Sequence, residues 1–222
     1  MQRLLYSALF SGMLLLIAVS CKKNKNNGSV SFQLRAQNQS SVVGGRIQSG
    51  ALTWNSGYVF VDKVDFEAEK DDDDEIEIES RIRRRVDLFG SVAQLGNIQL
   101  APGKYDEIEV DLDLVSTATD TAFVLRGSYV NNSGTTIPVL FFFREAMELE
   151  AEAENVVLTG ADDYRFLTTF DLSKLMLGIT QTQLNNATLT NGVLVISPNN
   201  NSSIFSTLLS NINKMDGVEL DD

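Results

Sequence analysis

In the middle of the chain, apolar and charged residues alternate with a period of two. In residues 58–69, 75–83 and 105–115 one set of alternate positions is mostly apolar, and the other set carries charges along much of each segment. Successive side chains of a β-strand point to opposite faces, so this pattern is typical of strands with one buried and one solvated face. We therefore expect an antiparallel sheet over this region.

Further short segments also have the character of strands, and polar turns separate them. They are residues 29–36, 122–130, 136–144, 147–157 and 164–170. Turn-forming residues at 131–134 and 160–163 punctuate the run. Seven or more short strands at this spacing predict a mainly β fold, an antiparallel β-sandwich over residues 29–170.

The last part of the chain, residues 171–222, is expected to form a small α+β segment packed on the sandwich. Asp171 is placed to cap a short helix, and residues 192–197 form a short apolar strand. Ser202 or Ser203 then caps a second helix, which ends at Gly217. Its apolar residues share one face: Ile204, Phe205, Leu208, Leu209, Ile212 and Met215.

Composition argues against several classes of function. The chain has no histidine, so it lacks the commonest general base and metal ligand. A single cysteine, Cys21, permits neither an intramolecular disulfide nor a zinc cluster of cysteines. A net charge of −12 argues against nucleic acid as a partner. We expect no cofactor and predict that the protein is not an enzyme.

Residues 1–20 have the pattern of an export signal. Arg3 precedes an apolar stretch that ends in small residues and is shorter than the ~20 residues of a membrane-spanning helix. Residues 18–21, Ala-Val-Ser-Cys, resemble the lipobox of bacterial lipoproteins. That resemblance implies cleavage before Cys21 and acylation of its thiol, with residues 21–28 as a flexible tether. The alternative is a plain secretory signal with an incidental cysteine.

Two acidic features are candidates for chemistry. The run from Asp71 to Glu75 could collect calcium, but it lacks the glycine of an EF-hand loop. We predict a solvated hairpin turn and no metal site, with the arginines of residues 81–85 facing Asp65 and Glu67 across the hairpin. Asp111 and Asp113 share one strand face, the minimum for glycoside hydrolysis. The neighbouring outward positions of this strand are also acidic, so nothing distinguishes Asp111 and Asp113 as a catalytic pair.

Aromatic residues near glycines are the remaining candidates. Residues 102–105, Pro-Gly-Lys-Tyr, predict a turn followed by a tyrosine whose hydroxyl bonds a backbone carbonyl, as in a tyrosine corner. Trp54, the only tryptophan, lies close to Tyr58 along the chain. These two rings could form a platform for stacking on a sugar; the alternative for Trp54 is a position at the end of the core.

The lipobox, the polar tether, residues 86–88 (Val-Asp-Leu) and residues 99–108 together resemble a family of Bacteroidota lipoproteins of unknown function. The resemblance implies an immunoglobulin-like or transthyretin-like sandwich at the cell envelope and supplies no catalytic residue. Residues 120–122, Asp-Thr-Ala, resemble a sequence that this phylum O-glycosylates, which makes Thr121 a candidate site.

These observations predict a non-enzymatic lipoprotein of the cell envelope, held at the outer membrane by its lipid anchor on the periplasmic or the surface face. Its partner would be an envelope protein or a glycan. The alternative is a glycan-binding module that uses Trp54 and nearby tyrosines.

Overall fold

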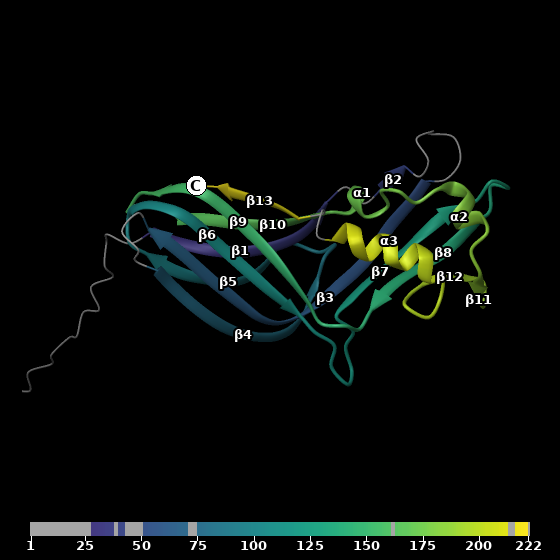
Figure 1. Cartoon of the computed structure of the whole chain (residues 1–222), viewed down its shortest axis with the longest axis horizontal. Coiled ribbons are helices and arrows are strands. Elements are labelled where there is room, and N and C mark those ends of the chain that lie inside the picture. Colours follow the sequence, from purple (N-terminus) through teal and green to yellow (C-terminus); the bar gives the residue numbers. More distant parts are fainter. Residues whose placement is uncertain are drawn as a thin grey trace, which may run out of the picture.

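The structure is a computed structural model, and it describes residues 28–37, 40–42, 51–70, 75–160, 163–212 and 216–221. This part of the chain is mainly β, with two sheets and a few short helices toward the C-terminus. It forms an elongated sandwich whose strands run along much of its length (Figure 1). The mainly β sandwich predicted from the alternation is confirmed.

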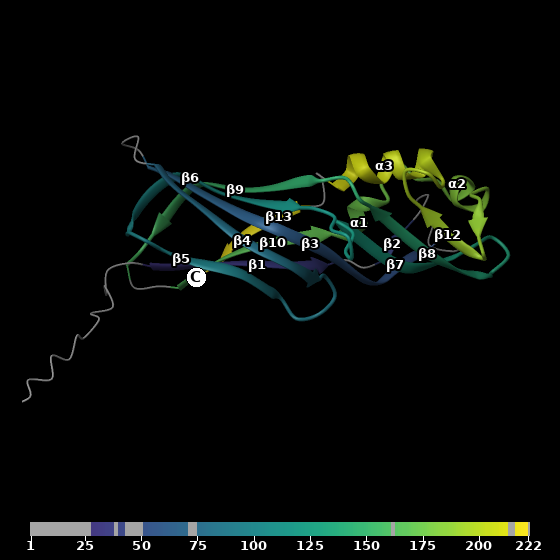
Figure 2. The ribbon, with the colours of Figure 1, turned by 90° about the horizontal axis from the view of Figure 1, so that it is seen from below.

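The smaller sheet has four strands in the order β13-β10-β1-β5. Their bounds are Asp216–Asp221 (β13), Asp163–Asp171 (β10), Gly28–Gln37 (β1) and Ala93–Leu100 (β5). The inner face of β1 carries Val30, Phe32 and Leu34, each no more than 4% exposed. This alternation gives β1 one buried apolar face, and Figure 2 shows the strand lying across from strands of the larger sheet.

The larger sheet has nine strands. Seven follow the order β11-β12-β8-β7-β3-β6-β9, and β2 and β4 pair with β3 beside this path. The bounds are Leu189–Thr190 (β11), Val193–Ile196 (β12), Thr136–Phe143 (β8), Phe123–Val130 (β7), Ala51–Lys70 (β3), Gly103–Leu114 (β6), Met147–Leu158 (β9), Ser40–Val42 (β2) and Glu75–Asp87 (β4).

Two strand pairs of this sandwich are parallel, and the other pairs among the described strands are antiparallel. β1 pairs in parallel with β10, and β8 pairs in parallel with β12. A parallel pair needs a crossover connection rather than a hairpin. In both pairs the partners are far apart in the sequence and other strands intervene, so such crossovers are available.

Strand β3 is shared by both ends of the molecule. Its residues 52–59 pair with β7, residues 58–69 with β4, and residues 61–70 with β6. The register shifts between Val61 and Lys63. This bulge reverses the buried positions: Val61 faces the core before it, and Val64 and Phe66 face the core after it.

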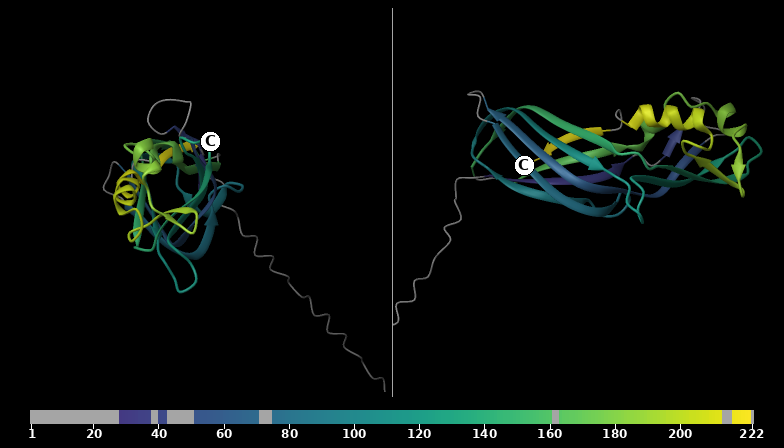
Figure 3. Two further views of the ribbon diagram at one scale, coloured as in Figure 1. Left: turned by 90° about the vertical axis from the view of Figure 1, so that its right-hand side faces the viewer. Right: turned by 60° about the horizontal axis from the view of Figure 1, so that its bottom comes forward.

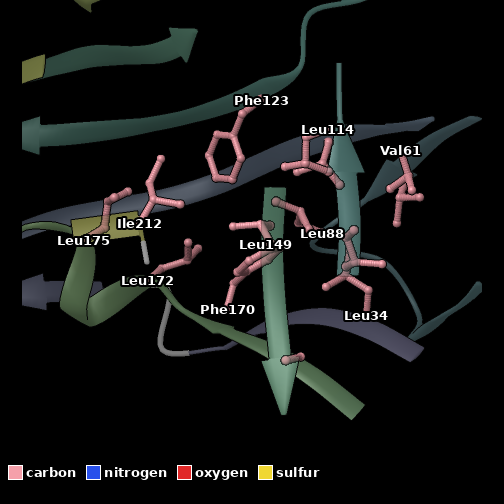
Figure 4. Close-up of a cluster of buried hydrophobic side chains, with 14 of the residues drawn as sticks. Leu34, Val61, Leu88, Leu114, Phe123, Leu149, Phe170, Leu172, Leu175 and Ile212 are labelled. Carbon is pink, nitrogen blue, oxygen red and sulfur yellow. The ribbon is translucent and has the colours of Figure 1, made fainter. Parts of the chain in front are cut away.

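A continuous hydrophobic core fills the space between the sheets. Figure 4 shows one part of it, where side chains from both sheets meet side chains from α1 (Leu172–Leu175) and α3 (Ser202–Ile212). The view down the long axis shows strands surrounding this interior (Figure 3). The labelled residues are Leu34, Val61, Leu88, Leu114, Phe123, Leu149, Phe170, Leu172, Leu175 and Ile212.

The C-terminal segment contributes strands to both sheets of the sandwich in addition to packing on it. β12 belongs to the larger sheet and β13 to the smaller one. The Asp171 side chain accepts a hydrogen bond from the Ser173 amide, as the predicted cap requires. The second predicted helix is α3. Gly217 lies in β13 and does not end that helix. A further helix, α2 (Gln181–Asn185), was not predicted.

Candidate functional site

The outward face of β4, β3, β6 and β9 carries the acidic ladder, three rows of carboxylates that lie in register across four strands. The strand pairings place like charges directly opposite one another in each row. The rows are Glu79-Asp65-Asp111-Glu150, Glu77-Glu67-Glu109-Glu152 and Glu75-Glu69-Glu107-Glu154. Opposed like charges destabilise a sheet, so the buried apolar face must offset their repulsion.

The acidic ladder raises the pKa values of several of its carboxyl groups. Desolvation, reinforced by the charge of Asp111, raises the pKa of Glu109 to about 7. Desolvation also raises the pKa of Glu107 and Glu67, with further contributions from the charges of Glu152 and Glu75 respectively. The charged forms of these groups are therefore disfavoured in the folded protein.

The raised pKa of Glu109 predicts that the protein is more stable at pH 5 than at pH 8. Between its ordinary pKa of 4.5 and about 7, the folded state holds a proton that the unfolded state has lost. Stability therefore falls as pH rises through this range. Glu109→Gln should raise the melting temperature at pH 8 by ~2–4 °C, which corresponds to ~1 kcal/mol, and should flatten the pH dependence.

Differential scanning calorimetry from pH 5 to pH 8 measures this effect. Glu145→Gln is the matched control, because Glu145 is exposed and lies outside the acidic ladder. Equal melting temperatures for wild type and Glu109→Gln at pH 8 would contradict the prediction.

The two carboxylates considered from the sequence as a possible acid and base pair, Asp111 and Asp113, have different surroundings. Asp113 lies 3.4 Å from the Lys63 ammonium, which also pairs with Asp65. The hydrogen bond to Asp65 is the largest cause of a raised pKa at Lys63. Asp111 instead lies within the acidic ladder, with its pKa raised by desolvation. This asymmetry does not single out a catalytic pair.

Three ladder carboxylates come close enough to consider a metal ion. Oxygens of Glu109, Asp111 and Glu150 lie within 4.8 Å of one another. Calcium takes six to eight oxygens, and a regular charged sheet face brings carboxylates together without an ion. We assign no metal to this group. Residues 71–74, most of the acidic run considered from the sequence, lie outside the described residues.

The arginines of β4 do not face Asp65 and Glu67, contrary to the prediction. The hairpin register places Glu79 opposite Asp65 and Glu77 opposite Glu67. Arg83 instead pairs with Asp62, with 3.0 Å between Nε and Oδ1. Of the other arginines of β4, Arg81 pairs with Glu79 on the same strand, and Arg85 lines a cavity.

This cavity, the arginine pocket, measures about 360 Å³ and lies on the outward face of the larger sheet. Its lining residues come from β3, β4 and β7: Ser56, Gly57, Tyr58, Arg85, Asp87 and Arg126. Strand pairing places Arg126 opposite Ser56 and Asp87 opposite Tyr58. The pocket therefore lies where β3 has β4 on one side and β7 on the other.

The guanidinium groups of the arginine pocket are not engaged in ion pairs with described carboxylates, although Asp87 lines the same cavity. In the part of the chain that the structure describes, neither Arg85 nor Arg126 forms an ion pair with a carboxylate. Arg85 lies over the Tyr58 ring, 3.6 Å from its centroid. Asp87, the acid of the pocket, accepts a hydrogen bond of 2.9 Å from the Phe89 amide.

Gly57 allows the backbone to pass close to β7 at the floor of the pocket. A Cβ atom there would lie 2.5 Å from Leu125 Cδ2 and 2.7 Å from the Val124 carbonyl oxygen. A larger residue would push the strands apart, so glycine keeps the pocket residues of β3 and β7 in register.

No protein-family model, curated protein or solved structure matches this chain.

The structure separates the two aromatic candidates. Tyr58 is partly exposed and lines the arginine pocket. Trp54 is fully buried, so its ring presents no face to a sugar, and a glycan platform cannot include it. Its alternative position, in the core, is the one observed.

The tyrosine corner is confirmed. Tyr105 is fully buried, and its hydroxyl donates a 2.8 Å hydrogen bond to the Ala101 carbonyl. This residue has a structural role at the start of β6.

The remaining predicted positions are a modification site and the anchor. Thr121 is partly exposed in the loop between β6 and β7, next to Asp120, and no observation tests its glycosylation. Cys21 and the tether before Gly28 lie outside the described residues. Within the described residues, no helix combines the length and apolar character needed to cross a bilayer.

Sequence reasoning missed Arg85 and Arg126 as site residues. The available signal was the cluster of four arginines in residues 81–85 within a chain of 30 acidic and 18 basic residues. The register that brings Arg126 to the same pocket could not be read from this signal.

Proposed function

We propose that this chain is a non-enzymatic lipoprotein of the cell envelope, anchored through acylated Cys21, whose folded part is a binding module. The arginine pocket is the observation that supports a binding role, because two guanidinium groups line one cavity without an acidic ion-pair partner among the described residues. The acidic ladder also fits a non-enzymatic role, because raised pKa values are shared among several of its carboxyl groups and do not distinguish one acid and base pair.

The position of the first described residue fits an anchored module. β1 begins at Gly28, at one end of the elongated molecule (Figure 1). Gly28 is the seventh residue after Cys21, so the two residues lie at most ~24 Å apart when the chain between them is fully extended. An acylated Cys21 would therefore hold this end of the module close to a membrane, and three acyl chains would make attachment effectively permanent.

Replacing Cys21 with serine is expected to release the protein from membranes, because a serine hydroxyl cannot take the place of the lipid-bearing thiol. Metabolic labelling with an alkyne fatty acid, followed by membrane fractionation, measures both parts of this claim. Wild type should incorporate label and sediment with membranes, and Cys21→Ser should do neither. Ser20→Ala is the adjacent control and should keep both properties. Label on the Cys21→Ser variant would refute this anchor site.

A glycan-binding module remains the second candidate function, and one observation favours it. Tyr58 lines the arginine pocket beside the exposed side chain of Ser56, whereas Trp54 takes no part. A glycan array is expected to show binding that weakens in Tyr58→Ala if this candidate holds. If the partner is an envelope protein instead, no glycan on the array should bind.

A further inference from the structure

The arginine pocket has the chemistry of an anion site in a protein that otherwise repels anions. The chain carries a formal net charge of −12, so nonspecific attraction of anions to its surface is disfavoured. Arg85 and Arg126 nevertheless line one cavity, and neither has an ion-pair partner among the described carboxylates. A guanidinium presents a planar fork of donors that matches a carboxylate or a phosphate.

The Tyr58 ring fixes one of these donors in place. With its guanidinium carbon 3.6 Å from the ring centroid, Arg85 is held by cation–π stacking. This contact covers one face of the ring. A ligand in the pocket would therefore interact with the charge of a positioned arginine. It could not stack a sugar ring on the face of Tyr58 that Arg85 covers.

Asp87 distinguishes between the anions that the two arginines could hold. Its carboxylate lines the same cavity, and one oxygen already accepts the Phe89 amide. A carboxylate is an acceptor, so its remaining capacity suits hydroxyl donors. Its negative charge penalises a dianionic phosphate more than a monoanionic carboxylate. Ser56 adds a hydroxyl that can donate or accept.

We propose that the arginine pocket binds a carboxylate-bearing, polyhydroxylated small molecule, that is, an acidic sugar, with its carboxylate on Arg85 and Arg126 and its hydroxyls toward Asp87 and Ser56. A cavity of about 360 Å³ lies near the lower end of the usual range for ligand sites, ~300–1,000 Å³, which fits a single sugar residue. This inference rests on the proposed role as a binding module and names the class of its ligand.

Isothermal titration calorimetry of the full-length chain in detergent tests the proposal at pH 7 and low salt. The probes are D-glucuronate, D-glucose and inorganic phosphate, with a polymer of galacturonate as a second arm. Glucuronate should bind, glucose should not, and phosphate should bind more weakly. Tighter binding of the polymer per uronate would place the natural source of the ligand in a polysaccharide. Equal binding would indicate a free acid.

Two variants and one control locate the site. Arg85→Gln and Arg126→Gln should each weaken glucuronate binding at least tenfold. Arg165→Gln removes the same charge from an exposed position on β10, in the other sheet, and should leave affinity unchanged. Circular dichroism of all three variants checks that each remains folded.

Several results would overturn the proposal. Equal binding of glucose, tighter binding of phosphate, an equal loss in Arg165→Gln, or no binding of any uronate at millimolar concentration would each do so. Failure of the proposed function can be distinguished from failure of this inference, because fatty-acid labelling of Cys21 does not depend on the pocket.

Discussion

Replacing Trp54 with alanine is expected to lower the free energy of unfolding by ~3–5 kcal/mol, the usual cost of removing a large aromatic side chain from a core. Trp54 is 0% exposed and lies on the inward face of β3, opposite Gly127 of β7. The surrounding strands are tied by ladder hydrogen bonds, so the structure can relax only partly into the space left behind. Chemical denaturation followed by circular dichroism measures the loss.

Tyr58→Ala provides the comparison on the same strand. Its ring is partly exposed on the outward face, so its removal leaves no closed cavity and should cost much less than the loss of Trp54. If Trp54→Ala kept wild-type stability, the indole would not be a core residue in solution. The sequence-based hypothesis of a Trp54 sugar platform would then return.

Replacing Leu208 with alanine is expected to cost ~2–5 kcal/mol of unfolding free energy, because this side chain is 0% exposed on the buried face of α3. The docking of α3 also satisfies a buried polar group. The side-chain nitrogen Nδ2 of Asn211 donates hydrogen bonds to the Leu175 and Leu177 carbonyl oxygens at 3.0 and 2.7 Å. The helix is thus held by apolar packing and by two directed hydrogen bonds.

Ser206→Ala is the control on the same helix, since Ser206 is exposed and its hydroxyl donates to the Ser202 carbonyl of the preceding turn. Alanine has a higher helix propensity than serine, so this change should be neutral or slightly stabilising. Thermal melts of the two variants that coincide with wild type would show that α3 is not docked in solution.

Strands with regular alternation were predictable, and strands with bulges were only partly so. The register of β3 shifts between Trp54 and Ser56, which interrupts the period of two and makes the Asn-Ser-Gly sequence there look like a turn. β5 (Ala93–Leu100) pairs with β1 through a register shift at Phe32 and Gln33, and Gly96 lies within it. The first half of β3 and all of β5 were missed for this reason.

Apart from the β3–β4 hairpin, strand partners were not predictable, because a period of two shows which face of a strand is buried but not which strand lies alongside. The parallel pairing of β1 with β10 is an example. The tyrosine corner was predictable because its hydrogen bond joins residues four apart, Tyr105 and Ala101. The arginine pocket was not, because Arg85 and Arg126 meet only through the pairing of two strands with β3.

The length of β3 determines how the molecule can move. Twenty residues at ~3.3 Å each give a strand of about 66 Å, and its ladders with β7, β4 and β6 span both ends of the molecule. Hinge motion between the ends would require bending this strand or breaking its ladders. We therefore expect the end bearing α2 to keep a nearly constant distance from the end where β1 begins (Figure 1).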